Sequence, residues 1–121
     1  MKPRIARLPK RRYRRRTVRV MVAYMGAAGP CVEAATTLGA GGLFIETETP
    51  LPEDTRVKLR FRIPGGELEH EIEGRVVWRR PSLARSSYAP GMGIEFTDRA
   101  AAGRLAQELE RVADREPGSA S

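Results

Sequence analysis

The sequence has only one cysteine and one histidine, and these low counts exclude a disulfide and a Cys/His metal site. A single cysteine cannot form an intramolecular disulfide. One cysteine and one histidine cannot supply the ligands of a Cys/His zinc site. No apolar run approaches the roughly 20 residues of a membrane-spanning helix, and no hydrophobic stretch follows the basic N-terminus as in a signal peptide. We therefore expect a cytoplasmic protein.

Enzyme motifs are also missing. The chain has no nucleophile elbow, no phosphate-binding loop and no dinucleotide-binding fingerprint. The only histidine, His70, shares a strand face with apolar residues, so it is either a satisfied, partly buried side chain or a rim residue. Cys31 is expected to pack as a small hydrophobe. Trp78 is expected to be a core or rim aromatic rather than a stacking platform. We expect a binding module that is not an enzyme and requires no cofactor.

Positive charge is concentrated at the N-terminus. Residues 1–20 contain ten basic residues and no acidic one, whereas the other 101 residues contain 12 basic and 15 acidic residues, a net charge of −3. The overall charge of +7 therefore belongs to an arm and not to the body of the protein. Guanidinium groups form forked hydrogen bonds with phosphate oxygens, so this arm favours an anionic partner.

Alternating hydrophobic residues dominate the middle of the chain and predict β-strands. The segments 57–63 and 68–78 alternate most clearly, and a bend or bulge is expected at Gly74. Shorter strands are expected over 17–24, 31–38, 43–47 and 93–96, with turns at the glycine- and proline-rich segments between them. Six or so short antiparallel strands indicate a mainly β protein, either a sandwich or a barrel.

One helix is expected at the C-terminal end, over about 99–113. Asp98 is placed to cap it, and Leu105, Leu109 and Val112 fall on one face. Arg104 and Glu108 have the i,i+4 spacing of a helical ion pair. The predicted organisation is a flexible basic tail over 1–10, one domain over 11–113 with an arginine arm at 11–16, and a flexible tail over 114–121.

Two segments stand out as a candidate binding site. Arg11-Arg-Tyr-Arg-Arg-Arg16 directly precedes the first strand, and Thr37-Leu-Gly-Ala-Gly-Gly42 is a glycine-rich turn between two strands. With the later segments 41–45, 51–55, 73–78 and 90–96, this ordered set resembles the PilZ domain family. The resemblance implies a six-stranded β-barrel with a C-terminal helix. It also implies a receptor for the bacterial second messenger cyclic di-GMP.

The resemblance assigns site residues in two halves. An Arg-x-x-x-Arg arm corresponds to Arg11 and Arg15, with Arg12 and Arg16 as the alternative register. The family's second motif is Asp or Asn, any residue, Ser, two residues and Gly. Thr37 stands at its first position and Gly39 at the Ser position, so only Gly42 matches. Two lost contacts of roughly 1.5–3 kcal/mol each would weaken binding by about two to four decades.

Three functions remain open from the sequence. The first is a PilZ-like adaptor with weak or lost cyclic di-GMP binding that regulates a protein partner in motility, polarity or surface processes, as a monomer or weak dimer. The second is a working cyclic di-GMP receptor clamped by Arg11 and Arg15. The third is a basic arm that binds nucleic acid or acidic lipid, with steep salt dependence.

Overall fold

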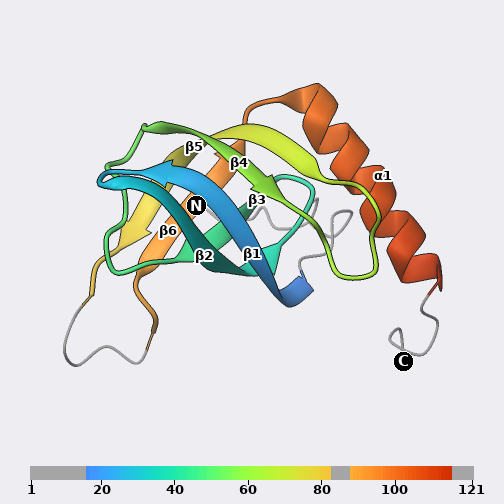
Figure 1. Ribbon diagram of the computed structural model, residues 1–121, viewed down its shortest axis with the longest axis horizontal. Helices are drawn as coiled ribbons and strands as arrows, with labels where there is room; N and C mark the ends of the chain where they lie inside the picture. The colour runs from blue at the N-terminus through green and yellow to red at the C-terminus, as the bar shows by residue number, and fades with distance from the viewer. Residues whose placement is uncertain (1–15, 83–87, 116–121) are drawn as a thin grey trace, which may run out of the picture.

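Six antiparallel strands form a closed barrel in the order β1-β2-β3-β6-β5-β4 (Figure 1). The computed structural model describes residues 16–82 and 88–115. Its elements are β1 (Arg16–Gly26), β2 (Gly29–Leu38), β3 (Gly42–Glu46), β4 (Arg56–Phe61), β5 (His70–Arg80), β6 (Gly91–Phe96) and α1 (Arg99–Arg115). The predicted mainly β barrel with one C-terminal helix is confirmed. Within the described ranges, no helix is long and apolar enough to cross a membrane.

The alternation in the sequence sets which side chains fill the barrel. In β4, Val57, Leu59 and Phe61 are buried, while the residues between them are exposed. In β1, Val20 and Val22 are buried in the same core. Successive side chains of a strand point to opposite faces, so a period of two places one row inside. Each fully buried aliphatic side chain contributes about 1.5–3 kcal/mol.

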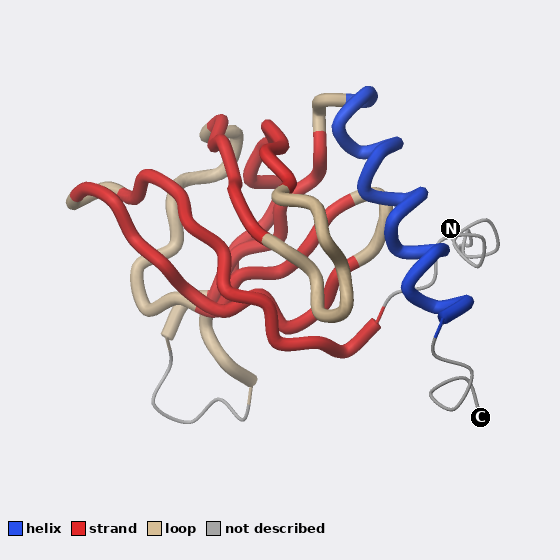
Figure 2. Tube along the Cα trace, turned by 45° about the vertical axis from the view of Figure 1, so that its right-hand side comes forward, coloured by secondary structure: helices blue, strands red, loops and turns tan. Residues whose placement is uncertain are grey.

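The helix α1 lies against one side of the barrel (Figure 2). The Asp98 carboxylate accepts a hydrogen bond from the Ala101 amide at 3.1 Å, which is the predicted N-cap. Leu105 and Val112 are buried in the barrel core, and Leu109 is partly buried against it. The helix therefore extends the core of the barrel rather than forming a separate unit.

Two local predictions are wrong. The register shift in β5 lies between Val76 and Trp78, where the strand pairs with β6, and not at Gly74. Leu68 precedes the strand and is 43% exposed, so it does not belong to the inward row. A bulge moves every following side chain to the other face. Trp78 is therefore 44% exposed instead of continuing the buried row of Ile72 and Val76.

The expected ion pair between Arg104 and Glu108 is also replaced by another contact. Glu108 is buried, and its Oε1 lies 2.7 Å from Nε2 of His70. Its Oε2 accepts hydrogen bonds from the amides of Glu67 at 2.7 Å and Leu68 at 3.0 Å. His70 is thus a satisfied, buried histidine, the first of the two roles expected for it.

Candidate ligand-binding site

The turn that carries the degenerate motif is fastened to two strands. The Gly39 amide donates to the Gly42 carbonyl at 3.0 Å, and the Gly41 carbonyl accepts from the Phe96 amide at 2.9 Å. A side chain at Gly42 would collide with the Ile94 carbonyl of the neighbouring strand β6. Gly42 is therefore needed for the close approach of β3 and β6, whatever else the motif does.

An open pocket of about 440 Å³ lies above this turn. Its lining comes from the turn, β2, β3, β5 and β6: Thr37, Gly39, Ala40, Gly41, Gly42, Leu43, Phe44, Val77, Trp78, Gly93, Ile94 and Glu95. All three motif positions singled out in the sequence thus line one surface. Four of the twelve lining residues are glycines and two are aromatic, and only Thr37 and Glu95 have polar side chains.

Trp78 lies on the rim of this pocket, in agreement with its expected role as a core or rim aromatic. Its ring stacks on Phe44 with centroids 5.2 Å apart and planes inclined by 21°. A side chain at Gly93 would collide with the indole ring, so the glycine lets the indole lie over β6. Trp78 pairs with Gly93 just after the register shift, which explains why simple alternation failed to place it. A half-exposed indole on a pocket wall can stack on a planar base.

Arg80 supports this wall through aromatic contacts. Its guanidinium carbon lies 4.9 Å from the ring centroid of Phe44, 5.5 Å from Trp78 and 5.2 Å from Tyr88. Its Nε donates to the Ala89 carbonyl at 2.7 Å. Cation–π contacts of this kind contribute about 0.5–1 kcal/mol each at exposed sites. Arg80 therefore connects the pocket wall to the segment that precedes β6.

The charged groups near the pocket are already engaged with each other. Glu95 lines the pocket and lies 3.2 Å from Arg75, which also contacts Asp54 at 2.9 Å. Both pairs are exposed, so they add little to stability. A carboxylate can accept from the N–H groups of a base but repels a phosphate. Phosphate recognition would have to come from cations outside the described lining.

Another polar cluster lies near the β1–β2 hairpin. The Tyr24 hydroxyl donates to Glu33 at 2.6 Å, and the Thr47 hydroxyl donates to the other carboxylate oxygen at 3.1 Å. Burial, together with the hydrogen bond and charge of Glu33, raises the pKa of Tyr24 far above its usual range. Tyr24 therefore remains a neutral donor, and this cluster holds the hairpin rather than forming an acid–base pair.

The predicted arm falls largely outside the described residues. Arg11, Arg12 and Arg15 lie there, and Arg16 is the first residue of β1. The backbone register places Arg16 opposite Leu38 and Thr17 opposite Thr37. The arm therefore joins the barrel beside the motif turn.

Comparison with known proteins identifies the family. The family model for the PilZ domain matches residues 9–112. No curated protein matches the sequence. Among solved structures, the chain is similar to the Bacillus subtilis inhibitor of motility MotI/DgrA, with a TM-score of 0.71 and 21% identity, over 98% of this chain and 57% of that one.

Two further structures share the fold. One is the PilZ domain of CeSA from a cellulose-synthesizing bacterium, with a TM-score of 0.55 and 22% identity, over 80% of this chain and 98% of that one. The other is Escherichia coli YcgR in complex with c-di-GMP, with a TM-score of 0.59 and 15% identity, over 93% of this chain and 51% of that one. With the barrel, the motif turn and the family match together, the chain belongs to the PilZ domain family.

Proposed function

We propose that this protein is a cytoplasmic PilZ signalling adaptor that acts through a protein partner. Its cyclic di-GMP pocket keeps its shape but has lost side chains that would hydrogen-bond the ligand, so that ligand binding is weak or lost. The observation that carries this proposal is the pocket of about 440 Å³ above residues 37–42. The complex of YcgR with c-di-GMP supports the class of ligand. The motility inhibitor among the similar structures supports motility as a process to test first.

The pocket chemistry supports the proposal of weak binding. Trp78 and Phe44 offer aromatic surface for a guanine base, and Thr37 offers one hydroxyl. Gly39 has no side chain to bond the ligand. The two departures from the family motif remove contacts of roughly 1.5–3 kcal/mol each. Affinity is then expected to be about two to four decades below that of a complete site.

The phosphates need a cationic clamp, which we assign to Arg11 and Arg15, with Arg12 and Arg16 as the alternative register. The pairing of Thr17 with Thr37 supports this assignment, because it brings the base of the arm to the pocket rim. Ordering the arm costs about 1–2 kcal/mol per residue, so only charge-assisted hydrogen bonds would offset it.

Titration calorimetry of the full chain with cyclic di-GMP, beside GTP and at two salt concentrations, tests this function. We expect weak or undetectable binding to the natural sequence. The double substitution Thr37→Asp with Gly39→Ser should tighten cyclic di-GMP binding by at least tenfold, without a gain for GTP. Thr36→Asp, on the neighbouring strand position, is the matched control. Unchanged affinity in the double variant would show that the turn is not part of the site.

The second candidate is a fully working receptor, and the exposed indole of Trp78 on the pocket wall favours it. This candidate predicts tight, guanine-selective binding by the natural sequence and its loss in Arg11→Ala or Arg15→Ala. It also predicts quenching of Trp78 fluorescence on binding. Trp78 is the only tryptophan of the chain, so the signal has one source.

A further inference from the structure

The outer face of the β1–β2 hairpin is apolar from Met21 to the turn. Three cross-strand pairs make up this face, Met21 with Ala34, Ala23 with Val32, and Met25 with Pro30. Met21 is 55% exposed, Met25 63% and Val32 60%. A strand on the surface of a barrel normally carries polar residues on its outer side. Contiguous exposed apolar surface of this kind marks an interaction site. We call these six residues the hairpin face.

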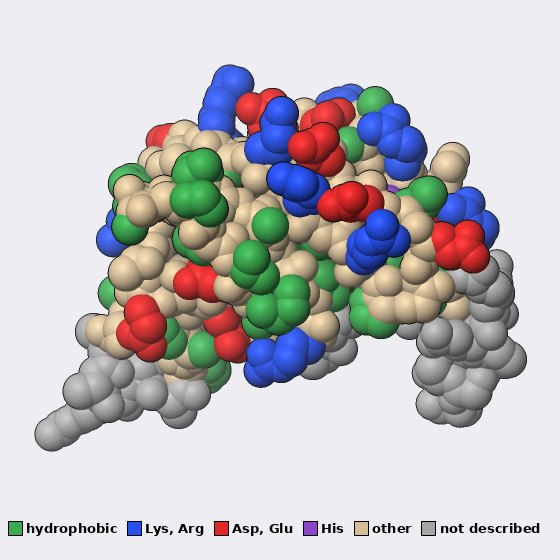
Figure 3. All heavy atoms as spheres, viewed as in Figure 1, with side chains coloured by type: hydrophobic (Ala, Val, Ile, Leu, Met, Phe, Trp, Pro, Cys, Tyr) green, Lys and Arg blue, Asp and Glu red, His purple; other side chains and the backbone are tan. Residues whose placement is uncertain are grey.

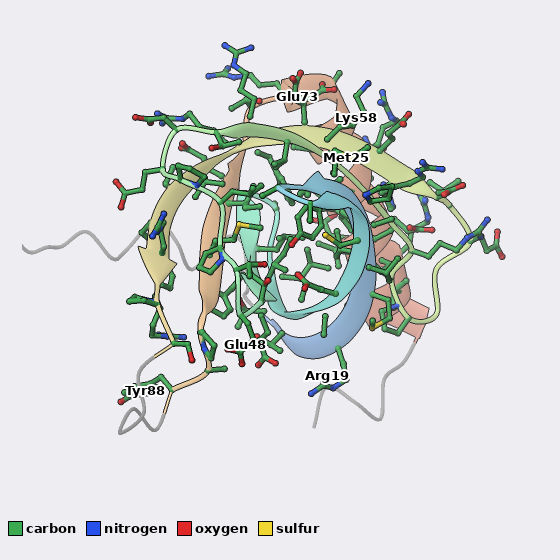
Figure 4. All side chains as sticks on the ribbon, turned by 60° about the vertical axis from the view of Figure 1, so that its left-hand side comes forward. Arg19, Met25, Glu48, Lys58, Glu73 and Tyr88 are labelled. Carbon is green, nitrogen blue, oxygen red and sulfur yellow. The ribbon has the colours of Figure 1, made fainter. Side chains whose placement is uncertain are left out.

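The hairpin face borders a row of basic side chains. Ala23 pairs with Arg60, the sole register pair between β1 and β4. A pocket of about 450 Å³ lies beside this pair. Its lining includes Met25, Val32, Lys58, Arg60 and Glu71, so two cations and one carboxylate border it. Figure 4 shows Met25 and Lys58 close together on this side, with Arg19 at the far end of β1. The pocket therefore joins an apolar wall to a charged wall whose net charge is positive.

The cations of this row are available to a partner. In the parts of the chain that the structure describes, neither Lys58 nor Arg60 has a carboxylate within 4.0 Å. Glu73 and Glu71 lie opposite them on β5, and Glu71 also lines the pocket beside the hairpin face. Figure 3 shows hydrophobic side chains over β1 and β2 and a band of mixed charge over β4 and β5. The surface thus runs from apolar to basic to acidic across neighbouring strands.

We propose that the hairpin face and the β4 cations form a docking site for an acidic protein segment that carries an aliphatic or aromatic anchor. The anchor would occupy the pocket between Met25 and β4, and carboxylates beside it would reach Lys58 and Arg60. Methionine adapts its shape to varied side chains, which suits a peptide groove. This proposal deepens the proposed function, since it names the surface through which a partner would bind.

The docking site is separate from the nucleotide pocket. Cys31 and Thr37 are six positions apart on β2, which corresponds to about 20 Å along a strand. Substitutions in the hairpin face therefore leave the lining of the nucleotide pocket in place. Failure of docking and failure of nucleotide binding can be measured independently on the same variants.

Panning a phage-displayed library of 15-residue peptides on the full chain tests the proposal. We expect enrichment of peptides that combine one large apolar residue with flanking Asp or Glu. Synthetic copies should bind at least tenfold more weakly to the double variant Met25→Lys with Val32→Lys. Lys58→Glu with Arg60→Glu should also weaken binding, and added salt should weaken binding to the natural sequence. Leu68→Lys, an exposed leucine elsewhere, is the matched control and should bind normally.

Each of the following outcomes would overturn the proposal. The panning could give no enrichment, or it could enrich basic peptides. Peptide binding could survive the double substitution Met25→Lys with Val32→Lys. Analytical ultracentrifugation could show self-association that this double variant abolishes. Cosedimentation with vesicles of phosphatidylglycerol and phosphatidylcholine that depends on the same residues would instead assign the face to a membrane. Circular dichroism confirms folding of each variant, and a cyclic di-GMP titration of each reports separately on the nucleotide pocket.

Discussion

Single residues shape the pocket above residues 37–42, and Arg80 is one that acts indirectly. It contacts Phe44, Trp78 and Tyr88 while its Nε bonds to Ala89. Arg80 itself is outside the pocket lining. Its role there is to position the indole, because a delocalised planar cation can stack on several rings at once.

Replacing Arg80 with alanine should loosen the aromatic wall. Loss of the ring contacts and of the hydrogen bond to Ala89 is expected to lower the free energy of unfolding by about 1–2 kcal/mol. The fluorescence anisotropy of Trp78 should fall, since its ring loses a neighbour. Arg79→Ala removes an adjacent, exposed arginine and should change neither quantity. Equal anisotropy in Arg80→Ala and the natural sequence would contradict the positioning role.

Gly42 gives a second test at the scale of a residue. Gly42→Ala places a methyl group against the Ile94 carbonyl and should push β3 from β6, at a cost of about 2–3 kcal/mol in urea denaturation. Gly41→Ala is the control, since nothing lies within 4 Å of the added methyl group. Similar stabilities for the two variants would show that the close approach of the strands is unimportant.

At the scale of elements, the contact of α1 with the loop before β5 depends on one carboxylate. Glu108 accepts from His70 and from the amides of Glu67 and Leu68. Burial by itself would raise the pKa of Glu108, but the hydrogen bonds from His70, Leu68 and Glu67 outweigh it and lower the pKa. The ionised carboxylate of Glu108 is therefore the form that makes these contacts, and its hydrogen bonds hold α1 against the barrel.

Glu108→Gln should weaken the attachment of α1 to the barrel. The amide nitrogen brings a donor to a place where donors already point, so we expect a loss of about 2–3 kcal/mol at neutral pH, measured by urea denaturation. Glu110→Gln, on the exposed side of α1, is the control and should be close to neutral. A stable Glu108→Gln variant would mean that the apolar contacts of α1 suffice.

The same carboxylate predicts the pH dependence of stability. The pKa of Glu108 is lower in the folded than in the unfolded protein. Its contribution is therefore complete above the unfolded value, near 4.3, and disappears as the pH falls through the folded value. The stability difference between the natural sequence and Glu108→Gln should shrink over this acid range. A difference that stays constant down to pH 2 would contradict the assignment.

For the whole molecule, the strand pair with the fewest register pairs is β1 and β4, where the barrel closes. β1 and β4 share one register pair, Ala23 with Arg60, whereas β3 and β6 share five. Local opening follows the regions with few backbone hydrogen bonds. Amides of this seam should therefore exchange with solvent at least tenfold faster than those between β3 and β6, as measured by NMR hydrogen exchange. Uniform protection across both lines would contradict this expectation.

Prediction from sequence succeeded where the signal is local. Alternation placed the strands and their buried rows, and Asp98 marked the helix start. Trp78 and Glu108 were misjudged because their places depend on distant partners, a bulge against β6 for one and His70 for the other. The register of Thr17 with Thr37 likewise emerges only from the folded sheet. The arginine register, Arg11 with Arg15 or Arg12 with Arg16, remains a prediction.

The glycine-rich turn also has an evolutionary consequence. Gly42 of the motif is tied to the packing of β3 against β6, whereas neither Thr37 nor Gly39 contributes a side chain to the hydrophobic core. A change at those two positions therefore removes no side chain from the core. A duplicated copy of such a gene could lose its response to the messenger by drift, keep its partner, and regain the response later through a pair of substitutions.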